Sequence, residues 1–187
     1  IYDSCFEIVV RKSAQDSLTY EKELPWDLVP FAVRNDKYRS IGTAFAISKT
    51  ELITAYHVME LAQDSLVEQE YAIRDREGRV FEVDQINAFD QRKDFVRFTV
   101  KGRTFSNWLE LNPTFQLNRT VFTAGNALGE GVIIRPGELI GTLPEPENGE
   151  WKILKSSADV SSGNSGGPLL DEKGKAILNE EGKPIVI

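Results

Sequence analysis

The sequence has one cysteine and one histidine among 187 residues, and this scarcity excludes several kinds of site. A single thiol cannot form an internal disulfide. We expect Cys5, which precedes the apolar run Phe6–Val10, to be a buried structural thiol rather than a nucleophile. One imidazole and one thiol cannot supply the ligand cluster of a zinc centre, so we expect no metal site.

Basic residues and long apolar runs are also scarce. The chain has 22 Lys and Arg against 29 Asp and Glu, which gives a net charge of -7 and a pI of about 4.9. We therefore expect no nucleic-acid partner, because phosphate binding relies on clustered basic side chains. No apolar run approaches the roughly 20 residues that a membrane span needs. A hydrophobic content of 41% is still enough for a sizeable core.

Short apolar segments separated by turn residues predict an all-β barrel or sandwich. Tyr56–Ala62 is expected to form one or two helical turns, Arg11–Pro30 a surface loop, and Lys101–Asn118 the link between two halves. The expected strands are Phe6–Val10, Leu28–Arg34, Ile41–Ser48, Glu51–Ala55, Tyr71–Arg74, Arg79–Ala88, Asp94–Val100, Val121–Ala124, Val132–Ile134, Glu138–Thr142, Trp151–Ser156, Leu169–Leu170, Lys175–Leu178 and Lys183–Ile187.

The densest run of small residues is Ser162-Gly163-Asn164-Ser165-Gly166-Gly167-Pro168-Leu169. Glycine is used where the backbone needs a positive φ or where another group approaches it closely. The run therefore predicts a tight turn that presents the Ser165 hydroxyl, which a base can convert into a nucleophile. The N–H groups of Gly163 and Ser165 would then form an oxyanion hole. The alternative interpretation is an ordinary Gly/Ser loop between strands.

A nucleophilic serine requires a base that titrates near neutral pH, and His57 is the only imidazole in the chain. That base requires an acceptor to fix its tautomer. Asp94, directly before the apolar segment that begins at Phe95, is our candidate, and spacing alone does not exclude Asp84 or Asp90. The alternatives are a solvated or core histidine and an ordinary loop aspartate.

Four segments in this order resemble the motifs of the trypsin-like serine peptidases of the chymotrypsin fold, and within them the bacterial HtrA/Deg-like branch. Several motifs in the family order are far more specific than any one alone. The segments are Gly42–Phe45 with Leu52–Val58 for the histidine region, Asp90 with Asp94 for the aspartate motif, Ala124–Gly129 for a family turn, and Gly163–Leu169 for the serine motif.

The resemblance implies two six-stranded antiparallel β-barrels packed face to face, with the active site in the cleft between them. The N-terminal barrel would span 1–104 and carry His57 and Asp94, 105–118 would be the linker, and a C-terminal barrel over 119–187 would carry the serine. The strand that walls the family's pocket is expected after the last residue, so we expect the second barrel to be truncated at its C-terminus.

The resemblance also implies an activity and a location. It implies a serine endopeptidase that needs no cofactor and cleaves unfolded or extended polypeptides through an acyl-enzyme. The triad would be His57, Asp94 and Ser165. The location would be the bacterial periplasm or the exterior, as a secreted protein, although no signal segment stands in this chain. The Arg11–Pro30 loop could hold an oligomer together or cover the cleft.

Two positions bear on how far the resemblance extends. Trypsin carries Asp where this chain has Asn164, and that Asp receives the new N-terminus on activation, so we expect no such switch here. Asp159 lies six residues before Ser165, where trypsin-like enzymes place the acid of the primary specificity pocket. It is our candidate substrate-binding residue and would select Lys or Arg by charge pairing. HtrA-like enzymes usually have a small apolar residue at this offset, so the preference stays open.

Two other functions are compatible with the same residues. The first is a latent or inactive trypsin-like module that binds peptides or regulates a partner. The second is a hydrolase that acts on esters only. Labelling of the serine by a fluorophosphonate probe, with Ser165→Ala as the control, distinguishes an assembled triad from the latent module.

Overall fold

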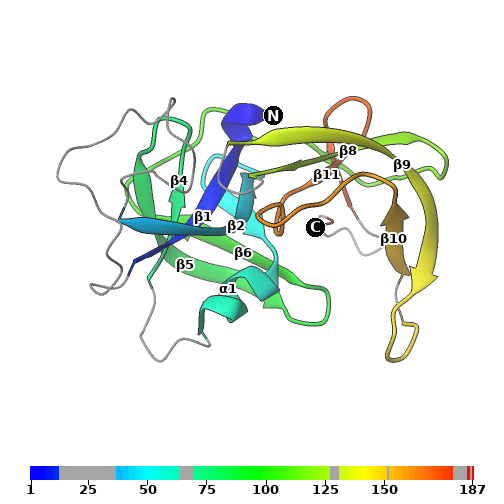
Figure 1. Cartoon of the computed structure of the whole chain (residues 1–187), viewed down its shortest axis with the longest axis horizontal. Coiled ribbons are helices and arrows are strands. Elements are labelled where there is room, and N and C mark those ends of the chain that lie inside the picture. The colour runs from blue at the N-terminus through cyan, green and yellow to red at the C-terminus, as the bar shows by residue number, and fades with distance from the viewer. Residues whose placement is uncertain (13–36, 64–69, 127–130, 151, 179–184, 186) are drawn as a thin grey trace.

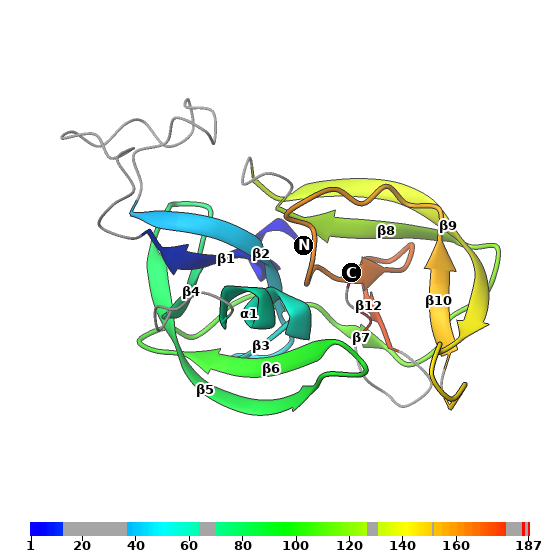
Figure 2. The same ribbon diagram turned by 60° about the horizontal axis from the view of Figure 1, so that its bottom comes forward.

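Two sets of six strands make up the fold of the computed structural model, which describes residues 1–12, 37–63, 70–126, 131–150, 152–178, 185 and 187. The first set closes into a barrel in the order β1-β2-β3-β6-β5-β4. The second forms a sheet in the order β10-β9-β8-β11-β12-β7. Figures 1 and 2 show the barrel on one side of the molecule and the sheet on the other, with α1 against the barrel.

The elements follow one another along the chain in the order of their labels. The barrel contains β1 (Cys5–Arg11), β2 (Tyr38–Ala46), β3 (Glu51–Thr54), β4 (Tyr71–Arg74), β5 (Val80–Asp90) and β6 (Phe95–Val100), with the 3-10 turn η1 (Tyr2–Ser4) before β1 and α1 (Tyr56–Gln63) after β3. The sheet contains β7 (Leu111–Asn112), β8 (Thr120–Gly125), β9 (Ile133–Pro144), β10 (Lys152–Ser156), β11 (Leu169–Leu170) and β12 (Ala176–Ile177).

The all-β prediction with two six-stranded units is confirmed. The two units differ in closure, because the second forms an open sheet among the described residues. They also differ in pairing: every strand pair of the barrel is antiparallel, whereas β12 pairs with β7 in parallel.

Alternate residues of the barrel strands face two different cores. In a strand, successive side chains point to opposite faces. Phe6 and Ala44 accordingly pack inside the barrel, whereas Phe45, the residue after Ala44, packs toward the second sheet. The second core joins Cys5, Phe45, Ile53, Phe95 and Leu109 to Ala124, Leu170 and Ala176. Most of β1 and the second half of β2 are buried on both faces, which explains why these segments are mostly apolar rather than alternating.

The second sheet differs from the predicted strand boundaries at β9. We expected two short strands, Val132–Ile134 and Glu138–Thr142, but one strand runs from Ile133 to Pro144. Its first half pairs with β8 and its second half with β10. Pro136 lies in the half that pairs on one side only, where a residue without an N–H is tolerated.

The predicted linker is described by the structure, whereas the predicted long loop and two of the predicted strands lie wholly or mostly outside the described residues. The expected linker 105–118 contains β7, and its Phe105 and Leu109 are buried. The division into 1–104, 105–118 and 119–187 stays a prediction. Most of the Arg11–Pro30 loop, the Leu28–Arg34 strand and most of the Lys183–Ile187 strand lie outside the described residues, and so does the oligomer contact proposed for that loop. None of the helical segments that the structure describes has the length and apolarity needed to cross a bilayer.

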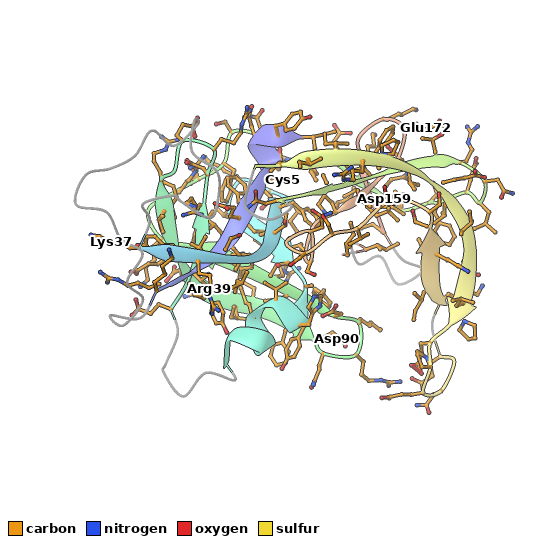
Figure 3. All side chains as sticks on the ribbon, viewed as in Figure 1. Cys5, Lys37, Arg39, Asp90, Asp159 and Glu172 are labelled. Carbon is orange, nitrogen blue, oxygen red and sulfur yellow. The ribbon has the colours of Figure 1, made fainter. Side chains whose placement is uncertain are left out.

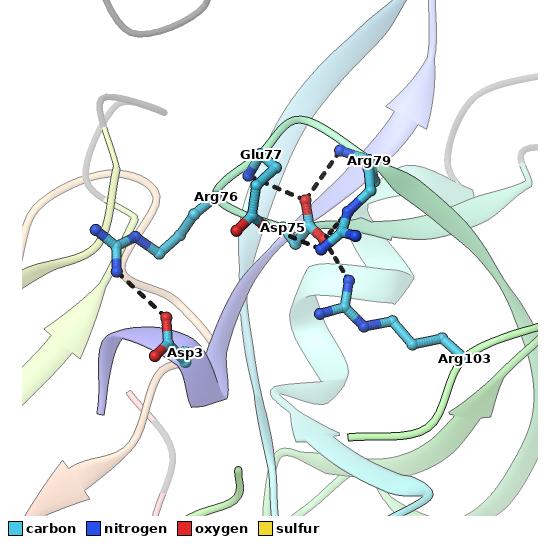
Figure 4. Close-up of polar contacts among 6 residues, drawn as sticks. All are labelled: Asp3, Asp75, Arg76, Glu77, Arg79 and Arg103. Carbon is cyan, nitrogen blue, oxygen red and sulfur yellow. Dashed lines mark hydrogen bonds and ion pairs between the residues drawn. The ribbon is translucent and has the colours of Figure 1, made fainter. Parts of the chain in front are cut away.

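A buried carboxylate organises the β4–β5 end of the barrel. Asp75 Oδ1 accepts the backbone N–H groups of Glu77 and Arg79 at 3.1 and 2.9 Å, and its Oδ2 accepts Arg79 Nε at 2.8 Å and an Arg103 N–H. Figure 4 shows these contacts together with the Arg76–Asp3 pair. Burial raises the pKa of Asp75, but the hydrogen bonds from Arg103 and Arg79 outweigh it and hold the pKa below its usual range.

Candidate active site

His57 and Asp94 lie in direct contact. His57 is the second residue of α1, and Asp94 ends the turn that joins β5 to β6. The imidazole Nδ1 lies 2.6 Å from Asp94 Oδ2, and the His57 backbone N–H donates to Asp94 Oδ1 at 2.8 Å. An ionised carboxylate only accepts hydrogen bonds, so it pairs with the imidazole tautomer that carries its proton on Nδ1. The other nitrogen, Nε2, is then left with a lone pair that can take up a proton.

The turn that presents Asp94 is tight and locally strained. Asp94 has a φ of 53°, in the left-handed region, which Asp tolerates better than most residues. Its N–H donates to Gln91 O at 3.3 Å, and the Lys93 N–H donates to Asp90 Oδ1 at 3.0 Å. Backbone strain of this kind is concentrated at functional sites. The turn directs the Asp94 carboxylate toward α1.

The two rival aspartates occupy other positions. Asp84 is exposed on β5, and Asp90 lies at the end of β5, where its carboxylate binds the backbone of the turn. Figure 3 labels Asp90 at the β5 end of the barrel. Of the three candidates, Asp94 is the one whose carboxylate contacts His57 among the described residues. The role of Asp94 in catalysis belongs to the proposal below.

An ion-pair cluster ties this turn to the second sheet. Arg92 lies 3.3 Å from Glu145, 3.5 Å from Glu147 and 3.3 Å from Glu150, in the loop between β9 and β10. Glu145 is buried, and its carboxylate also accepts backbone N–H groups of the same loop. Hydrogen bonds from these N–H groups, of which that of Asn148 has the largest effect, lower the pKa of Glu145 against the effect of burial.

Ser165 lies in a tight turn that leaves two backbone donors available. The Asn164 N–H donates to Ser161 O at 3.0 Å, and the Gly167 N–H donates to Asn164 O at 2.9 Å. Within the described ranges, the N–H groups of Gly163 and Ser165 have no acceptor. Two unpaired N–H groups so close together in the chain are the kind of donor pair that an oxyanion requires.

Gly42 brings the serine backbone and the histidine helix to one point. A Cβ added at Gly42 would lie 2.9 Å from Ser165 O and 2.7 Å from Cγ1 of Val58, the residue after His57. Only glycine permits this approach. No hydrogen bond joins the Ser165 hydroxyl to the imidazole in the part of the chain that is described. Such contacts are often long without substrate and shorten when it binds.

Asp159 and Asn164 occupy contrasting environments. Asp159 is exposed, and its backbone carbonyl accepts the Thr123 hydroxyl at 3.2 Å. Figure 3 places it beside the second sheet. Its predicted contact with substrate stays a prediction. Asn164 is buried, and its Oδ1 has no hydrogen-bond partner among the described residues. That oxygen would lie 2.6 Å from a Cβ at Gly125, so the amide packs tightly against β8.

The sequence analysis missed one residue of this region and one cavity. Thr43 was included in the histidine-region motif but was given no role, although it binds the serine loop through its N–H and its hydroxyl. The signal for it is a single polar side chain within the run Ile41–Ile47, whose other residues are glycine or apolar. A separate cavity of about 350 Å³ lies in the second sheet, among residues that include Phe115, Arg119, Leu139, Lys173 and Ile177.

Comparisons with known proteins agree with this geometry. The family model described as a trypsin-like peptidase domain matches residues 42–177. "Protease Do-like 5, chloroplastic" of Arabidopsis thaliana is 30% identical over 166 residues, which cover 76% of this chain and 48% of the relative. "Anti-sigma-I factor RsgI9" of Acetivibrio thermocellus is 28% identical over 145 residues, which cover 76% of this chain and 19% of the relative. The chain therefore spans about half of one curated relative and about a fifth of the other.

Two solved structures share the fold. The crystal structure of Deg5 superposes with a TM-score of 0.64 at 23% identity and covers 95% of this chain and 82% of that chain. The crystal structure of the Rv3671c protease in its inactive form superposes with a TM-score of 0.60 at 19% identity, and the match covers 94% of this chain and 75% of that chain. At these identities the superpositions show the fold alone.

Proposed function

The chain belongs to the trypsin-like peptidase family, and we propose that it is a serine endopeptidase with Ser165, His57 and Asp94 as its triad. The resemblance to the HtrA/Deg-like branch is confirmed by the family model together with the curated relative Protease Do-like 5, and the shared fold agrees with it. The observation that carries the proposal is that His57 binds both Asp94 oxygens, one through Nδ1 and one through its backbone N–H. Gly42 lies close both to Val58, the residue after His57, and to the Ser165 backbone.

The first half-reaction forms an acyl-enzyme. The Ser165 hydroxyl oxygen attacks the carbonyl carbon of the scissile bond while its proton passes to His57 Nε2. Asp94 stabilises the resulting imidazolium through Nδ1 and stays ionised. The carbonyl oxygen becomes an oxyanion and accepts the Gly163 and Ser165 N–H groups, each worth about 3 kcal/mol in the transition state. The tetrahedral species then expels the amine, which takes the proton from Nε2.

The second half-reaction regenerates the enzyme. Water attacks the acyl carbon and gives its proton to His57 Nε2, and the same N–H groups hold the second oxyanion. Ser165 leaves as the alcohol after His57 returns the proton. Each half-reaction moves one proton through the imidazole, first from serine to the amine and then from water to serine, and neither requires a cofactor.

The substrates proposed are unfolded or extended polypeptides, and this proposal rests on the family resemblance. A preference for Lys or Arg at the cleaved bond would follow if Asp159 lay at the base of the pocket. The proposed location is the bacterial periplasm or the exterior. One curated relative bears the description chloroplastic, so location varies among similar proteins.

A second candidate function is a latent module that binds peptides without turnover. The observation that favours it is that the Ser165 hydroxyl has no hydrogen bond to His57 within the described residues. A module of this kind would keep the His57–Asp94 contact but fail to activate the serine.

Labelling with a fluorophosphonate probe tests the proposal. We expect stoichiometric labelling of the wild type that is lost in Ser165→Ala and falls by about 10⁴-fold in rate in Asp94→Asn. Asp84→Asn is the matched control and should label like the wild type, because Asp84 is exposed on β5. Absence of labelling in the folded wild type refutes an active peptidase and favours the latent module. Peptides ending in Arg, Val or Phe then test the role of Asp159, and a preference for Val contradicts it.

A further inference from the structure

Thr43 is the point at which the barrel binds the serine loop. The residue is fully buried in β2, at 0% exposure. Its N–H donates to Ser165 O at 2.8 Å, and its Oγ1 donates to Gly163 O at 2.7 Å. One side chain and its own N–H thus bind the carbonyl oxygens of the two residues whose N–H groups are proposed to hold the oxyanion.

The direction of the Thr43 hydrogen bonds is fixed by its surroundings. Oγ1 accepts the Asn126 N–H at 2.8 Å, and a hydroxyl has one proton to donate. That proton is therefore directed at Gly163 O. The Thr43 carbonyl accepts the Thr54 hydroxyl at 2.7 Å, which anchors β2 to β3 a few residues before His57. Hydrogen bonds in such a buried network strengthen one another.

The serine loop needs an external anchor because its backbone is permissive. Gly163 has a φ of 96°, and glycine reaches this region and several others at little cost. The Gly163 N–H lies in the preceding peptide unit, which is joined through the Gly163 Cα to the unit between Gly163 and Asn164 that carries Gly163 O. The Thr43 hydroxyl bond selects one orientation of that unit. The Thr43 N–H bond does the same for the unit that follows Ser165.

We propose that Thr43 is a positioning residue: it fixes the peptide units that follow Gly163 and Ser165, and it thereby holds the backbone from which the Gly163 and Ser165 N–H groups project in the arrangement that binds an oxyanion. The hydroxyl contributes through Gly163 O, and it does not touch substrate. This inference rests on the proposed function, because the oxyanion hole is part of it. It predicts that the Thr43 hydroxyl affects turnover rather than substrate affinity.

Isosteric variants of Thr43 separate the hydroxyl from the packing. Thr43→Val keeps the shape and removes the hydroxyl, and Thr43→Ser keeps the hydroxyl. We expect kcat to fall about 30-fold in Thr43→Val with KM within about twofold, somewhat less than the loss of an oxyanion donor itself. Thr43→Ser should stay within about threefold of the wild type. Thr123→Val is the matched control, since it removes another buried threonine hydroxyl that donates to a backbone carbonyl outside the serine loop.

A proton resonance locates the defect. The chain has one histidine, so a strongly downfield Nδ1–H signal comes from His57 alone. The signal should persist in Thr43→Val, because the Asp94 contact is untouched. Equal kcat in Thr43→Val and Thr43→Ser, or a fall in Thr43→Val no larger than in Thr123→Val, overturns the inference. If Thr43→Val does not fold, Thr43→Cys takes its place, because a thiol is a weak donor of similar size. The kcat of Thr43→Cys should lie between that of Thr43→Ser and the value expected for Thr43→Val.

Amide hydrogen exchange tests Thr43 without any activity. The N–H groups of Asn164 and Gly167 are bonded within the serine turn, so their exchange reports its opening. We expect about tenfold faster exchange at both positions in Thr43→Val and wild-type rates in Thr43→Ser. Unchanged exchange in Thr43→Val refutes the positioning role. An unlabelled wild type with this exchange pattern refutes the proposed peptidase while the structural anchoring by Thr43 stands.

Discussion

Gly166→Ala is a one-carbon change that places an atom between the two halves of the molecule. A Cβ at this position would lie 2.2 Å from Thr43 O and 2.3 Å from Thr54 Oγ1. Both distances are far below van der Waals contact, and one partner is the backbone of β2. Gly166 also has a φ of 88°, which an L-residue adopts only with strain. The alanine therefore meets both a conformational and a steric penalty.

The two penalties can be estimated separately. A left-handed φ costs a non-glycine residue about 1–2 kcal/mol. Overpacking a well-filled interior by one methyl costs about 1–3 kcal/mol, because neighbours must leave their preferred positions. We expect the free energy of unfolding to fall by about 2–5 kcal/mol in total. The residue that precedes Gly166 is Ser165, so relief of the overlap would also displace the proposed nucleophile and abolish most labelling by a fluorophosphonate.

Two other glycines supply the controls. Gly102 has a φ of 71° with nothing within 4 Å of the added Cβ, so Gly102→Ala carries the conformational penalty alone. Gly141 has open space and no positive φ, so Gly141→Ala should be neutral or stabilising by up to about 1 kcal/mol. Urea unfolding of the four proteins measures the series. A Gly166→Ala protein no less stable than Gly102→Ala would refute the close packing of the serine loop against β2.

Three further predictions concern other parts of the molecule. Asp75→Asn should lower the unfolding free energy by about 2 kcal/mol at pH 7, because Arg103 and Arg79 lose a charged acceptor. The pKa of Asp75 is lowered in the folded state, so its contribution is present above its unfolded pKa of about 3.9 and lost as pH falls through the folded value. The difference in unfolding free energy between the wild type and Asp75→Asn, measured in urea, should be smaller at pH 3 than at pH 7. An equal difference at the two pH values would contradict the lowered pKa. Cys5 should resist iodoacetamide at pH 8 in the native protein and react fully in urea, since burial raises its pKa to about 12; rapid native alkylation would contradict its burial. Arg92→Gln should lower the melting temperature by about 1–3 °C at low ionic strength. The decrease should be smaller in 1 M salt, where ion pairs are screened. Arg76→Gln, which removes the exposed ion pair with Asp3, is the comparison.

The strands of the barrel were predictable because their sequences carry a strong local signal. β-branched and aromatic residues in runs of four to eight, bounded by turn residues, are typical of strands, and β1, β3, β4 and β6 lie where they were expected. The second sheet was harder. Pro136 and Gly137 read as a break, but the fold pairs that half of β9 on one side only, where a proline disrupts nothing. Pairing partners decide such a case, and a local pattern does not contain them.

The candidate site was predictable in its residue types and less so in its geometry. Asp84, Asp90 and Asp94 are chemically equivalent in the sequence. What separates them is a left-handed backbone conformation at Asp94, which turns one carboxylate toward α1 while Asp90 stabilises the turn itself. A non-glycine residue in that conformation leaves no signature that spacing can detect. The family resemblance selected the same residue through its motif, which is an associative argument rather than a physical one.

The contacts of Thr43 show why the two halves form a single site. The serine loop joins two strands of the second sheet, yet its carbonyl groups bind β2 of the barrel, and Gly42 and Gly166 allow the two backbones to touch. His57 follows β3, which the Thr54 hydroxyl joins to Thr43 O. The imidazole and the serine are therefore positioned from the same pair of strands, although 108 residues separate them in the sequence (165 minus 57). A shift of the sheet relative to the barrel cannot occur without breaking these buried hydrogen bonds, so the geometry of the site and the packing of the two halves must be lost together.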